Sequence, residues 1–470
     1  MNTPTIKTRF APSPTGLIHL GNARTALFNA LYAYRHQGTL LLRIEDTDLE
    51  RSQTEYVQQL MTDLHWLDLN WHEGPQVGGD NGPYYQSERN EIYAHYYALL
   101  EQQDAVYPCF CTPSELALAR KLQRTAGQAP RYAGTCAYLS QAEIAAKLEQ
   151  GLKPTLRFRV PRGQKIEFLD LVKGQQQFAT DDIGDFIIRR ADGTPAFFFC
   201  NAIDDALMGV THVFRGDDHL TNTPRQIMML QALGLTIPQY GHIALIVGDD
   251  GTPLSKRNGS QSIQELRENG WLAEGVVNYL ARLGHTYSEE SYLSLTELAN
   301  HFAVERLGRA PAHFDEQQLR HWQQMAVLQA SATRLWDWIG QTVAAQVPHD
   351  LQTQFIAAIR SNMTYPHEAL HWAKILFSDE LIFSPEAQTV LAKAGSDFFH
   401  QAIVTLATTQ GNYPEWVKQL KQATGTQGKN LFMPLRAALT GEVHGPEMAN
   451  LLPLIGLERA RRRLQANIMG

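Results

Sequence analysis

Long apolar runs are missing from this sequence. No stretch approaches the roughly 20 consecutive apolar residues that a membrane-spanning helix needs, and residues 1–7 lack the apolar core of a signal peptide. These absences argue against a membrane anchor and against export. We therefore expect a cytoplasmic protein that does not associate with membranes.

Cysteine is scarce, with only 4 among 470 residues. So few thiols cannot form the disulfide framework that is typical of small secreted proteins. Three of them, Cys109, Cys111 and Cys136, lie in one short segment, and this clustering favours a metal site. Cys200 stands apart in an apolar run and is expected to be a buried thiol.

An excess of positive charge is also absent, because 41 Lys and Arg residues and 48 Asp and Glu residues give a formal net charge of −7. This balance does not mark the chain as a nucleic-acid-binding protein. It does not exclude one either, since binding depends on local charge and a basic face can coexist with acidic surfaces elsewhere.

Apolar patterning predicts an α/β fold in the first part of the chain. A strand over 5–11, a helix over 22–36 and a buried strand over 39–44 follow one another. This order is typical of a nucleotide-binding α/β domain. The Gly-x-Gly-x-x-Gly turn of dinucleotide-binding proteins is missing between the first strand and the helix, which disfavours an NAD-type protein.

The α/β pattern is interrupted and then returns. Residues from about 85 to 195 hold the cysteine cluster and two predicted strands, over 155–160 and 185–190, and these residues fit an inserted domain. After them we predict a strand over 210–215, a helix over 222–233 and a strand over 242–247.

Beyond about residue 260 the spacing of apolar residues predicts helices. The first short ones are expected over 263–269, 272–283, 293–302 and 316–326. Later breaks in the helical pattern are expected at Pro348, Pro366, Pro385 and Pro414. A chain of 470 residues is too long for one core, so two to four domains are expected.

A first motif, RFAPSPTGLIHLGN, spans residues 9–22. It joins the end of a strand, a turn rich in proline and glycine, and the start of a helix. Backbone N–H groups at a helix start can bind phosphate oxygens, the His19 imidazole can donate to them, and Gly21 leaves room for a ligand. Taken alone, His19 is more simply a capping residue.

A second motif, GTPLSKRNG, spans residues 251–259, about 230 residues after the first. It carries Ser255, Lys256 and Arg257, whose donors and charges suit a departing pyrophosphate. A solvated basic turn is the simpler interpretation of this motif alone. The preceding strand and the flanking glycines favour a loop held at a sheet edge, and the two motifs together predict a nucleoside triphosphate site.

In this order the two motifs resemble the signature sequences of class I aminoacyl-tRNA synthetases, and among them the glutamyl branch. The family's His-Ile-Gly-His corresponds to HLGN at 19–22, and the glutamyl branch often lacks the last histidine. The family's Lys-Met-Ser-Lys-Ser corresponds to PLSKR at 253–257. RIEDTD at 43–48 and VTHVFRGDDH at 210–219 also resemble stretches of the glutamyl branch.

The resemblance implies the fold class and the domains. It implies an α/β fold with a Rossmann-type class I catalytic domain, an inserted α+β domain that contains zinc and binds the acceptor end of tRNA, and an all-α C-terminal anticodon-binding domain. The predicted limits are 1–85 and 196–250 for the two catalytic halves, 86–195 for the insert, 251–320 for the signature loop with stem-contact helices, and 321–470 for the anticodon-binding domain.

The resemblance also implies the binding residues for L-glutamate and for ATP with Mg²⁺. The implied catalytic residues are His19, Ser255, Lys256 and Arg257. The implied ATP-binding residues are Ser13, His19, Gly21, Asp218, Leu245, Ile246 and Lys256. The implied glutamate-binding residues are Arg9, Ala11, Ser13, Glu45, Phe197, Asn201 and Arg215, with Glu45 on the amino group and the two arginines on a carboxylate. An internal ion-pair network is the alternative for Arg9, Glu45 and Arg215, and it is compatible with binding.

Two residues depart from the family pattern. Pro253 replaces the first lysine of the second signature, so Lys256 is expected to carry more of the phosphate charge. Phe197 replaces a tyrosine whose hydroxyl helps to bind the amino acid, so that polar contact is lost or is made by water. Both departures suggest a diverged second copy more than a housekeeping enzyme.

The cysteine cluster offers three of the four ligands that zinc prefers. Zinc-containing glutamyl enzymes have a histidine where this chain has Tyr138. A shorter, tRNA-modifying relative resembles this chain in placing a tyrosine ligand four residues before the third cysteine, as Tyr132 is here. The resemblance implies structural Zn²⁺ held by Cys109, Cys111, Cys136 and Tyr132. Tyr138 is the alternative fourth ligand, and three buried thiols without metal are the alternative to zinc.

The implied function is that of the glutamyl branch. Glutamate is activated by ATP to glutamyl-adenylate and transferred to the 3′ end of tRNA-Glu. Transfer to tRNA-Gln is an alternative, and an inactive RNA-binding paralogue is a remote one. The expected partners are tRNA, ATP and L-glutamate, and the expected state is a monomer.

Overall fold

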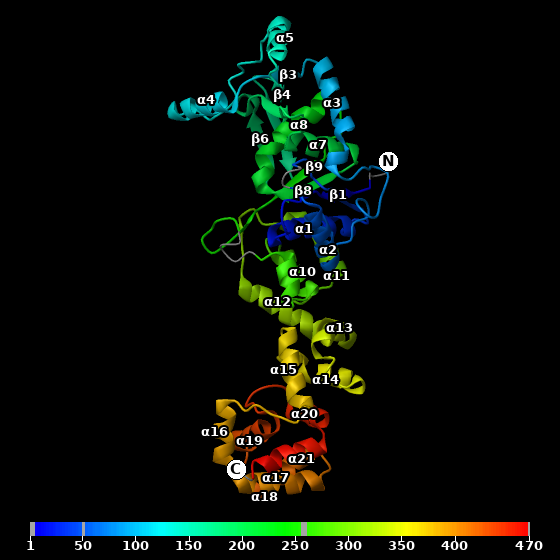
Figure 1. Ribbon diagram of the computed structural model, residues 1–470, viewed down its shortest axis with the longest axis vertical. Coiled ribbons are helices and arrows are strands. Elements are labelled where there is room, and N and C mark those ends of the chain that lie inside the picture. The colour runs from blue at the N-terminus through cyan, green and yellow to red at the C-terminus, as the bar shows by residue number, and fades with distance from the viewer. Residues whose placement is uncertain (1–4, 49–51, 255–260, 469–470) are drawn as a thin grey trace. The chain divides into compact units, whose positions relative to one another are not determined.

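The computed structural model describes residues 5–48, 52–254 and 261–468. The chain divides into two compact units (Figure 1). The first comprises Met1–Asn269 and Val276–Glu316, and the second comprises Gly270–Gly275 and Gln317–Gly470. Within the described ranges, no helix is both long enough and apolar enough to cross a membrane.

Parallel strands form the centre of the first unit. β1 (Lys7–Phe10) pairs with β2 (Thr39–Leu42) in parallel, and α1 (Leu20–Arg35) connects them. The alanine and leucine residues that predicted α1 are buried in it. β8 (His212–Gly216) pairs in parallel with β9 (Gln239–Ile243). The predicted α/β fold is therefore confirmed.

A backbone hydrogen bond links the two pairs of strands, because the N–H of Thr211 donates to the carbonyl of Lys7 at 2.9 Å. β8 thus lies beside β1, as Figure 1 also shows. The carboxyl ends of neighbouring parallel strands meet at one edge of a sheet, where ligands bind in open α/β folds. This edge carries Phe10, Leu42 and Gly216.

The predicted strand over 242–247 is wrong as one element. β9 ends at Ile243, and β10 (Ile246–Val247) leaves to pair in parallel with β11 (Ala312–His313). At the break, the buried guanidinium of Arg24 donates to the carbonyl of Ala244. The partner strand β8 ends at Gly216, opposite Ile243, so the ladder ends there and the chain leaves it.

The first unit contains further helices besides α1. In chain order they are α2 (Thr54–Trp66), α3 (Asn90–Gln102), α4 (Pro113–Thr125), α5 (Gln141–Glu149), α6 (Thr180–Ile183), α7 (Phe197–Leu207), α8 (Thr223–Ala232), α9 (Ile263–Glu268) and α11 (Leu295–His301). Short 3₁₀ segments lie at Gln86–Glu88, Asp217–Asn222 and Val304–Arg306. The helices predicted over 263–269 and 293–302 are therefore present, with slightly different ends.

An antiparallel sheet marks the interruption between the two parallel pairs. β4 (Thr155–Phe158) lies between β3 (Val106–Cys109) and β7 (Phe186–Arg189). A hairpin of β5 (Lys165–Asp170) and β6 (Gly174–Ala179) follows in sequence, and α4 extends from this region in Figure 1. The two strands predicted within 85–195 are β4 and β7.

The second unit is helical throughout its described elements. They are α13 (Ala332–Val343), α14 (Gln352–Ile359), α15 (Pro366–Phe377), α16 (Pro385–Ala394), α17 (Ser396–Thr408), α18 (Tyr413–Thr424), α19 (Lys429–Thr440), α20 (Met448–Ile455) and α21 (Leu457–Ala466). The predicted helices over 272–283 and 316–326 correspond to α10 (Ala273–Arg282) and α12 (Glu316–Gln329), which contain the boundary between the two units.

Proline starts several of these helices, as the sequence predicts. Pro366, Pro385 and Pro414 each stand in the first turn of a helix, where the missing N–H costs no hydrogen bond. Pro348 precedes a short 3₁₀ segment. The core around them is apolar, and the indole of Trp416 is fully buried and donates to the carbonyl of Ala402 at 3.0 Å.

Candidate functional site

The first signature begins with the last two residues of β1 and continues beyond its carboxyl end. Ala11 is half-buried and Ser13 is exposed. The N–H of Glu45 donates to the carbonyl of Pro12 at 3.0 Å, so the turn lies against the chain that follows β2. In the first turn of α1, a Cβ added at Gly21 would meet no described atom within 4 Å. No acidic side chain stands in that turn, so the helix start is open to an anion.

His19 is the residue before α1 and has an extended backbone, with φ −100° and ψ 167°. It forms an isolated antiparallel bridge with Ser262, and the N–H of Ile263 donates to the carbonyl of Ile18 at 2.9 Å. Ser262 in turn caps α9 through a reciprocal pair of bonds with Glu265. The chain after the second signature therefore lies directly against the first signature.

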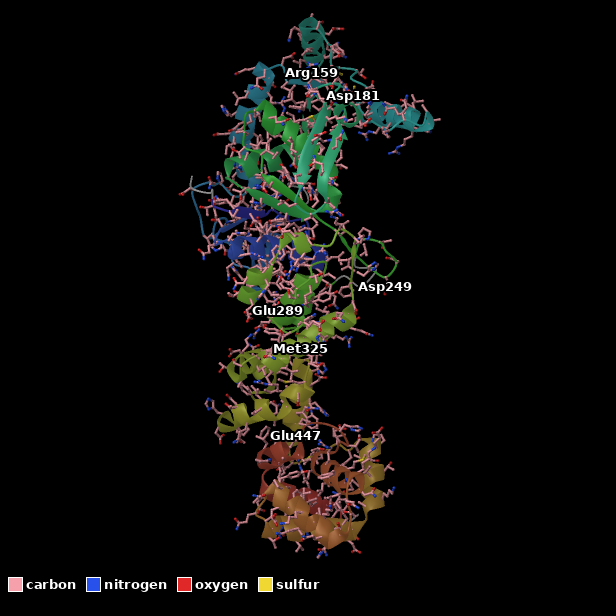
Figure 2. The ribbon with its side chains drawn as sticks, turned by 180° about the vertical axis from the view of Figure 1, so that it is seen from behind. Arg159, Asp181, Asp249, Glu289, Met325 and Glu447 are labelled. Carbon is pink, nitrogen blue, oxygen red and sulfur yellow. The ribbon has the colours of Figure 1, made fainter. Side chains whose placement is uncertain are left out.

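Three predicted catalytic residues lie outside the described residues: Ser255, Lys256 and Arg257. The chain before them forms a tight turn, because the N–H of Gly248 donates to the carbonyl of Thr252 at 3.0 Å and the N–H of Leu254 donates to the carbonyl of Ile246 at 2.9 Å. Asp249 is exposed on this turn (Figure 2). The chain before the second signature is thus held by β10, and the chain after it is held by the bridge between Ser262 and His19.

The end of β8 brings three predicted ATP-binding residues together. A Cβ added at Gly216 would collide with the carboxylate of Asp218 and lie 3.3 Å from Cδ2 of Leu245. Asp218 is exposed, Leu245 is half-buried and Ile246 is buried in β10. Glycine at 216 thus allows an acidic and an aliphatic side chain to meet at this corner.

Buried ion pairs connect two of the predicted glutamate-binding residues. Nε of Arg9 donates to both carboxylate oxygens of Asp205, at 3.1 and 3.2 Å. Nη1 of Arg43 lies 2.8 Å from Asp205 Oδ1, and its Nη2 donates to Glu45 Oε1 at 2.9 Å. The internal ion-pair network that the sequence allows as an alternative is therefore present for Arg9 and Glu45.

Arg215 differs from Arg9 because its hydrogen-bond partners in the described part of the chain are neutral. Its Nη2 donates to Thr223 Oγ1 and to Gln226 Oε1, at 2.7 Å each, and its Nε donates to His242 Nε2 at 3.2 Å. Burial, together with the positive charge of the nearby Arg9, lowers the pKa of Arg215 to about 10. A buried guanidinium without a carboxylate partner favours an anionic ligand.

Asn201 connects Arg215 to Glu45. Gln226 Nε2 donates to Asn201 Oδ1 at 2.9 Å, and Asn201 Nδ2 donates to Glu45 Oε1 at 2.7 Å. Arg9, Glu45, Asn201 and Arg215 therefore belong to one continuous network, although β1, the chain after β2, α7 and β8 each supply only one of them.

Besides Arg43 Nε, which lies 3.9 Å from Asp204 Oδ2, two buried atoms of this network have no hydrogen-bond partner among the described residues: Glu45 Oε2 and Arg215 Nη1. Burial raises the pKa of Glu45 although its ion pair with Arg43 opposes the shift. An unpaired buried polar atom costs free energy. A ligand with an ammonium group and a carboxylate would satisfy both atoms with charge-assisted bonds.

Phe197 begins α7 and is half-buried. Its ring stacks on the His219 imidazole, with centroids 5.4 Å apart and planes inclined by 28°. His219 Nδ1 lies 3.3 Å from Nδ2 of Asn222. The position at which the family has a hydroxyl therefore holds an aromatic pair in this chain.

The sequence did not single out five residues that support the network: Asp170, Asp205, Thr223, Gln226 and His242. An acidic pair inside the apolar helix α7 is a signal that could have marked Asp205, because buried carboxylates need partners. Asp170 and His242 give no local signal, since each gains its role from partners far away in the sequence.

The cysteine cluster is compact. The three sulfurs of Cys109, Cys111 and Cys136 lie within 4.8 Å of one another, so the clustering predicted from the sequence is confirmed. The Tyr132 hydroxyl lies 3.3 Å from the Cys109 sulfur and 3.5 Å from the Cys111 sulfur. The N–H of Cys136 donates to the same hydroxyl at 2.9 Å. One phenol oxygen and three sulfurs thus converge on one point.

Tyr138 does not belong to this group, because 92% of its surface is exposed. The donor set therefore favours Tyr132 over Tyr138 as the fourth ligand. Three thiolates and one phenolate would satisfy the tetrahedral preference of zinc.

Arg157 lies against the cluster, with its guanidinium carbon 3.7 Å from the centre of the Tyr132 ring. Burial alone would raise the pKa of Cys109, but hydrogen bonds from Tyr132 and Arg157 lower it to about 7. Burial raises the pKa of Cys111 to about 11. The cluster therefore holds one thiol that ionises readily, and a metal ion would favour ionisation of the others.

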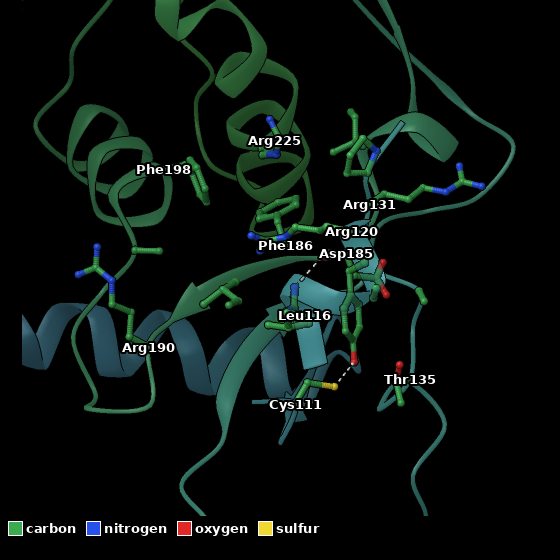
Figure 3. Close-up of a pocket in the computed structure, with 18 of the residues that line it drawn as sticks. Cys111, Leu116, Arg120, Arg131, Thr135, Asp185, Phe186, Arg190, Phe198 and Arg225 are labelled. Carbon is green, nitrogen blue, oxygen red and sulfur yellow. Dashed lines mark hydrogen bonds between the residues drawn. The ribbon is translucent and has the colours of Figure 1, made fainter. Parts of the chain in front are cut away.

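A pocket of about 840 Å³ extends from this cluster to the start of α7 (Figure 3). Five arginines line it: Arg120, Arg131, Arg157, Arg190 and Arg225. Aromatic side chains also line it: Tyr132, Phe186, Phe197 and Phe198. The Arg225 guanidinium lies 5.9 Å from the ring centres of both Phe186 and Phe198. This combination suits a phosphate backbone with unstacked bases.

Two family models match the sequence of this chain. Residues 5–321 match the model described as tRNA synthetases class I (E and Q), catalytic domain. Residues 294–468 match an anticodon binding domain.

Curated relatives cover nearly the whole chain. A protein named Glutamate–tRNA ligase 2 from Nitrosococcus oceani is 58% identical over 465 residues, which are 99% of this chain and 98% of that protein. A Glutamate–tRNA ligase 1 from Methylococcus capsulatus is 54% identical and covers 98% of each chain.

A solved structure has the same fold. It is a glutamate tRNA ligase from Elizabethkingia meningosepticum in complex with its amino acid, and it is 27% identical with a TM-score of 0.89 over 99% of each chain.

Proposed function

This chain belongs to the class I aminoacyl-tRNA synthetases, in the branch for glutamate and glutamine, and we propose that it is a glutamate–tRNA ligase. The observation that carries the substrate assignment is the pair of unpaired buried atoms, Glu45 Oε2 and Arg215 Nη1. Their charges suit an amino acid that has a second carboxylate in its side chain.

The proposed reaction has two steps. An oxygen of the glutamate α-carboxylate attacks the α-phosphorus of ATP, the bond to the bridging oxygen of the β-phosphate breaks, and pyrophosphate leaves. A hydroxyl of the terminal ribose of tRNA then attacks the carbonyl of the adenylate, and AMP leaves. Because the α-carboxylate must stay free to react, Arg215 and Arg9 serve the side-chain carboxylate, while Glu45 serves the ammonium group.

The remaining proposed contacts to glutamate are made by Ala11, Ser13, Phe197 and Asn201. Asn201 donates to Glu45 and accepts from Gln226, so it holds the carboxylate of Glu45 in place. Phe197 offers the substrate an aromatic face without a hydroxyl.

The proposed ATP site lies between the two signatures. The open start of α1 at Gly21 suits a phosphate, with Ser13 and His19 beside it. Asp218, Leu245 and Ile246 face the nucleoside. Lys256 and Arg257 would neutralise the departing pyrophosphate, Ser255 would donate a hydrogen bond to it, and Mg²⁺ bound to ATP would add positive charge. Two contacts support this assignment: Leu254 is hydrogen-bonded to Ile246 of β10, and Ser262 bridges His19.

The cysteine cluster is proposed to hold one structural Zn²⁺ through Cys109, Cys111, Tyr132 and Cys136. Zinc would supply no catalytic step there. It would fix the loop that carries Arg131 on the wall of the 840 Å³ pocket, and that pocket is the proposed site for the acceptor end of tRNA.

The proposed RNA substrate is tRNA-Glu, and tRNA-Gln is the second candidate. The departures at Pro253 and Phe197 favour a diverged copy, which keeps tRNA-Gln open. The proposed domain limits stay as predicted from the sequence, with anticodon recognition assigned to residues 321–470. We expect a cytoplasmic protein that is a monomer, and gel filtration of the purified chain would check the oligomeric state.

Aminoacylation of purified tRNA-Glu and tRNA-Gln by the full-length chain tests the proposal. Glutamate should be attached to one of them or to both, and glutamine and aspartate should not be attached. Pyrophosphate exchange with tRNA present should depend on glutamate. Absence of both activities would show an inactive RNA-binding paralogue instead. Arg215→Lys should raise the glutamate KM by about tenfold or more, since it removes a charge-assisted contact.

A further inference from the structure

A buried chain of hydrogen bonds runs from Asp170 to Arg215. Asp170, at the end of β5, accepts from Nδ1 of His242 at 2.5 Å. The other ring nitrogen, His242 Nε2, accepts from Nε of Arg215 at 3.2 Å and lies 3.0 Å from Thr223 Oγ1. Asp170 and His242 are 1% and 0% exposed, so water does not compete for these bonds.

The direction of every bond in this chain is determined. Arginine can only donate, so Nε2 of His242 must be an acceptor and Nδ1 must carry the proton. Gln226 accepts from Arg215 and donates to Asn201, which donates to Glu45. Carboxylates thus terminate the chain at both ends, and they leave one tautomer for His242.

We propose that Asp170 and His242 form a positioning pair that orients the Arg215 guanidinium for the side-chain carboxylate of glutamate. The proposal rests on the function proposed for Arg215. The neutral imidazole supplies an acceptor for Nε, while Thr223 and Gln226 hold Nη2. Nη1 is then the nitrogen left without a partner among the described residues, and its direction is set by the other two.

The tautomer depends on how Asp170 is held. Its Oδ1 accepts three backbone N–H groups, those of Val172 at 2.9 Å, Lys173 at 2.7 Å and His242 at 3.2 Å. An asparagine at 170 must therefore keep its carbonyl oxygen at the Oδ1 position. Its amide nitrogen would then face His242 Nδ1 and donate to it. The imidazole proton would move to Nε2, opposite the N–H of Arg215.

Asp170→Asn is therefore an isosteric change that turns an acceptor for Arg215 into a donor. In aminoacylation with saturating tRNA, we expect the glutamate KM to rise by about tenfold or more, on the scale of one charge-assisted hydrogen bond. The ATP KM should change less than threefold, and the thermal midpoint should stay near that of the natural chain. A merely structural role would lower stability and would not raise the glutamate KM selectively.

The matched control is Glu73→Gln. Glu73 is also a buried carboxylate of the first unit, but it accepts from Lys7, Asn81 and Tyr84 and touches none of the network around Arg215. This variant should keep the glutamate KM. An equal rise in the control would overturn the proposal, because burial of any carboxylate would then explain the effect.

A second-site change tests the tautomer itself. The amide of glutamine reaches the position of the imidazole Nε2 and can accept from Arg215 whatever residue 170 is. The double variant Asp170→Asn with His242→Gln should therefore bind glutamate at least threefold better than Asp170→Asn alone. Absence of this rescue overturns the positioning mechanism.

Two single variants decide the question if Asp170→Asn does not fold. His242→Asn occupies only the Nδ1 position and leaves Arg215 without its acceptor, whereas His242→Gln supplies the acceptor. The glutamate KM should be higher in His242→Asn, and equal values overturn the proposal. Arg215→Lys separates the two hypotheses. An unchanged glutamate KM in Arg215→Lys contradicts the proposed substrate site. A raised KM in Arg215→Lys with an unchanged KM in Asp170→Asn contradicts only the positioning pair.

Discussion

Phe197 is the residue at which this chain departs from its family inside the proposed amino-acid site, and it stacks on His219. Phe197→Tyr adds one hydroxyl beside the proposed ligand. A hydrogen bond to a charged group contributes about 1.5–3 kcal/mol, and part of this gain is offset by desolvation of the hydroxyl. We expect the glutamate KM in aminoacylation to fall severalfold.

Phe198→Tyr is the matched control for Phe197→Tyr. It adds the same hydroxyl one residue further along α7, where the ring of Phe198 lies against Arg225 and Phe186. The glutamate KM should not change in this variant. An unchanged or raised KM in Phe197→Tyr would show that the pocket already compensates for the missing hydroxyl.

Lys256 is the cation on which the activation step is expected to depend, because Pro253 stands where the family has another lysine. Lys256→Ala should lower the rate of pyrophosphate exchange by ~10² or more, the usual scale for loss of a contact to developing charge. The thermal midpoint should stay the same, and Lys256→Arg should retain more activity than Lys256→Ala. Near-normal exchange in the alanine variant would contradict the role proposed for this residue.

At the scale of elements, the cysteine cluster is the feature whose chemistry is easiest to test. Protein purified without added zinc should contain about one equivalent of metal, and the double variant Cys109→Ser/Cys111→Ser should contain none. Tyr132→Phe should weaken zinc binding, whereas Tyr138→Phe should not, because Tyr138 is 92% exposed. Zinc content that is unaffected by the cysteine changes would rule out this site.

The helix α21 carries a run of arginines, and one of them stabilises the fold instead of facing a ligand. An arginine run such as 459–463 is ordinarily a solvated helix face or a set of phosphate contacts. Arg463 is instead buried and donates to the carbonyls of Leu439 at 2.6 Å, Ile375 at 2.6 Å and Ser378 at 2.7 Å. These bonds satisfy carbonyl groups at the ends of α15 and α19, where the last carbonyls of a helix lack partners inside it.

Arg463→Met should therefore destabilise the second unit by about 2 kcal/mol or more, because three buried carbonyls lose a charged donor. Arg461→Met is the control, since Arg461 is exposed on the same helix. Thermal or urea unfolding, followed by circular dichroism, measures the difference. Equal stability of the two variants would show that the carbonyls find other partners.

At the scale of the whole molecule, we expect the first unit to carry out the chemistry and the helical second unit to recognise the anticodon of tRNA. The proposed active site lies entirely in the first unit, whereas direct readout of RNA favours unstacked bases such as those of an anticodon loop. Exchange of residues 321–470 for those of an enzyme of known tRNA choice should therefore transfer the preference between tRNA-Glu and tRNA-Gln. A preference that stays with the N-terminal part would contradict this assignment, and charging by both parents under the same conditions is the control.

Local signals in the sequence were sufficient for the α/β order, for proline at helix starts and for the two signatures. Apolar spacing depends on neighbours along the chain, and a motif keeps its residues together, so both are visible without a structure. The family followed from the same short stretches. Residue limits of the elements were less exact, and the strand over 242–247 was wrong because β8 ends opposite Ile243 and the following residues pair with the distant β11.

The sequence by itself determined the family, the residues expected to meet glutamate and the cysteines expected to meet a metal. Only the tertiary structure decided which tyrosine stands among the sulfurs, and which residues hold Arg215. Asp170, His242 and Gln226 are brought to that arginine by β5, β9 and α8. Such contacts depend on how strands pair and helices pack across the whole unit, and no pattern of neighbouring residues records them.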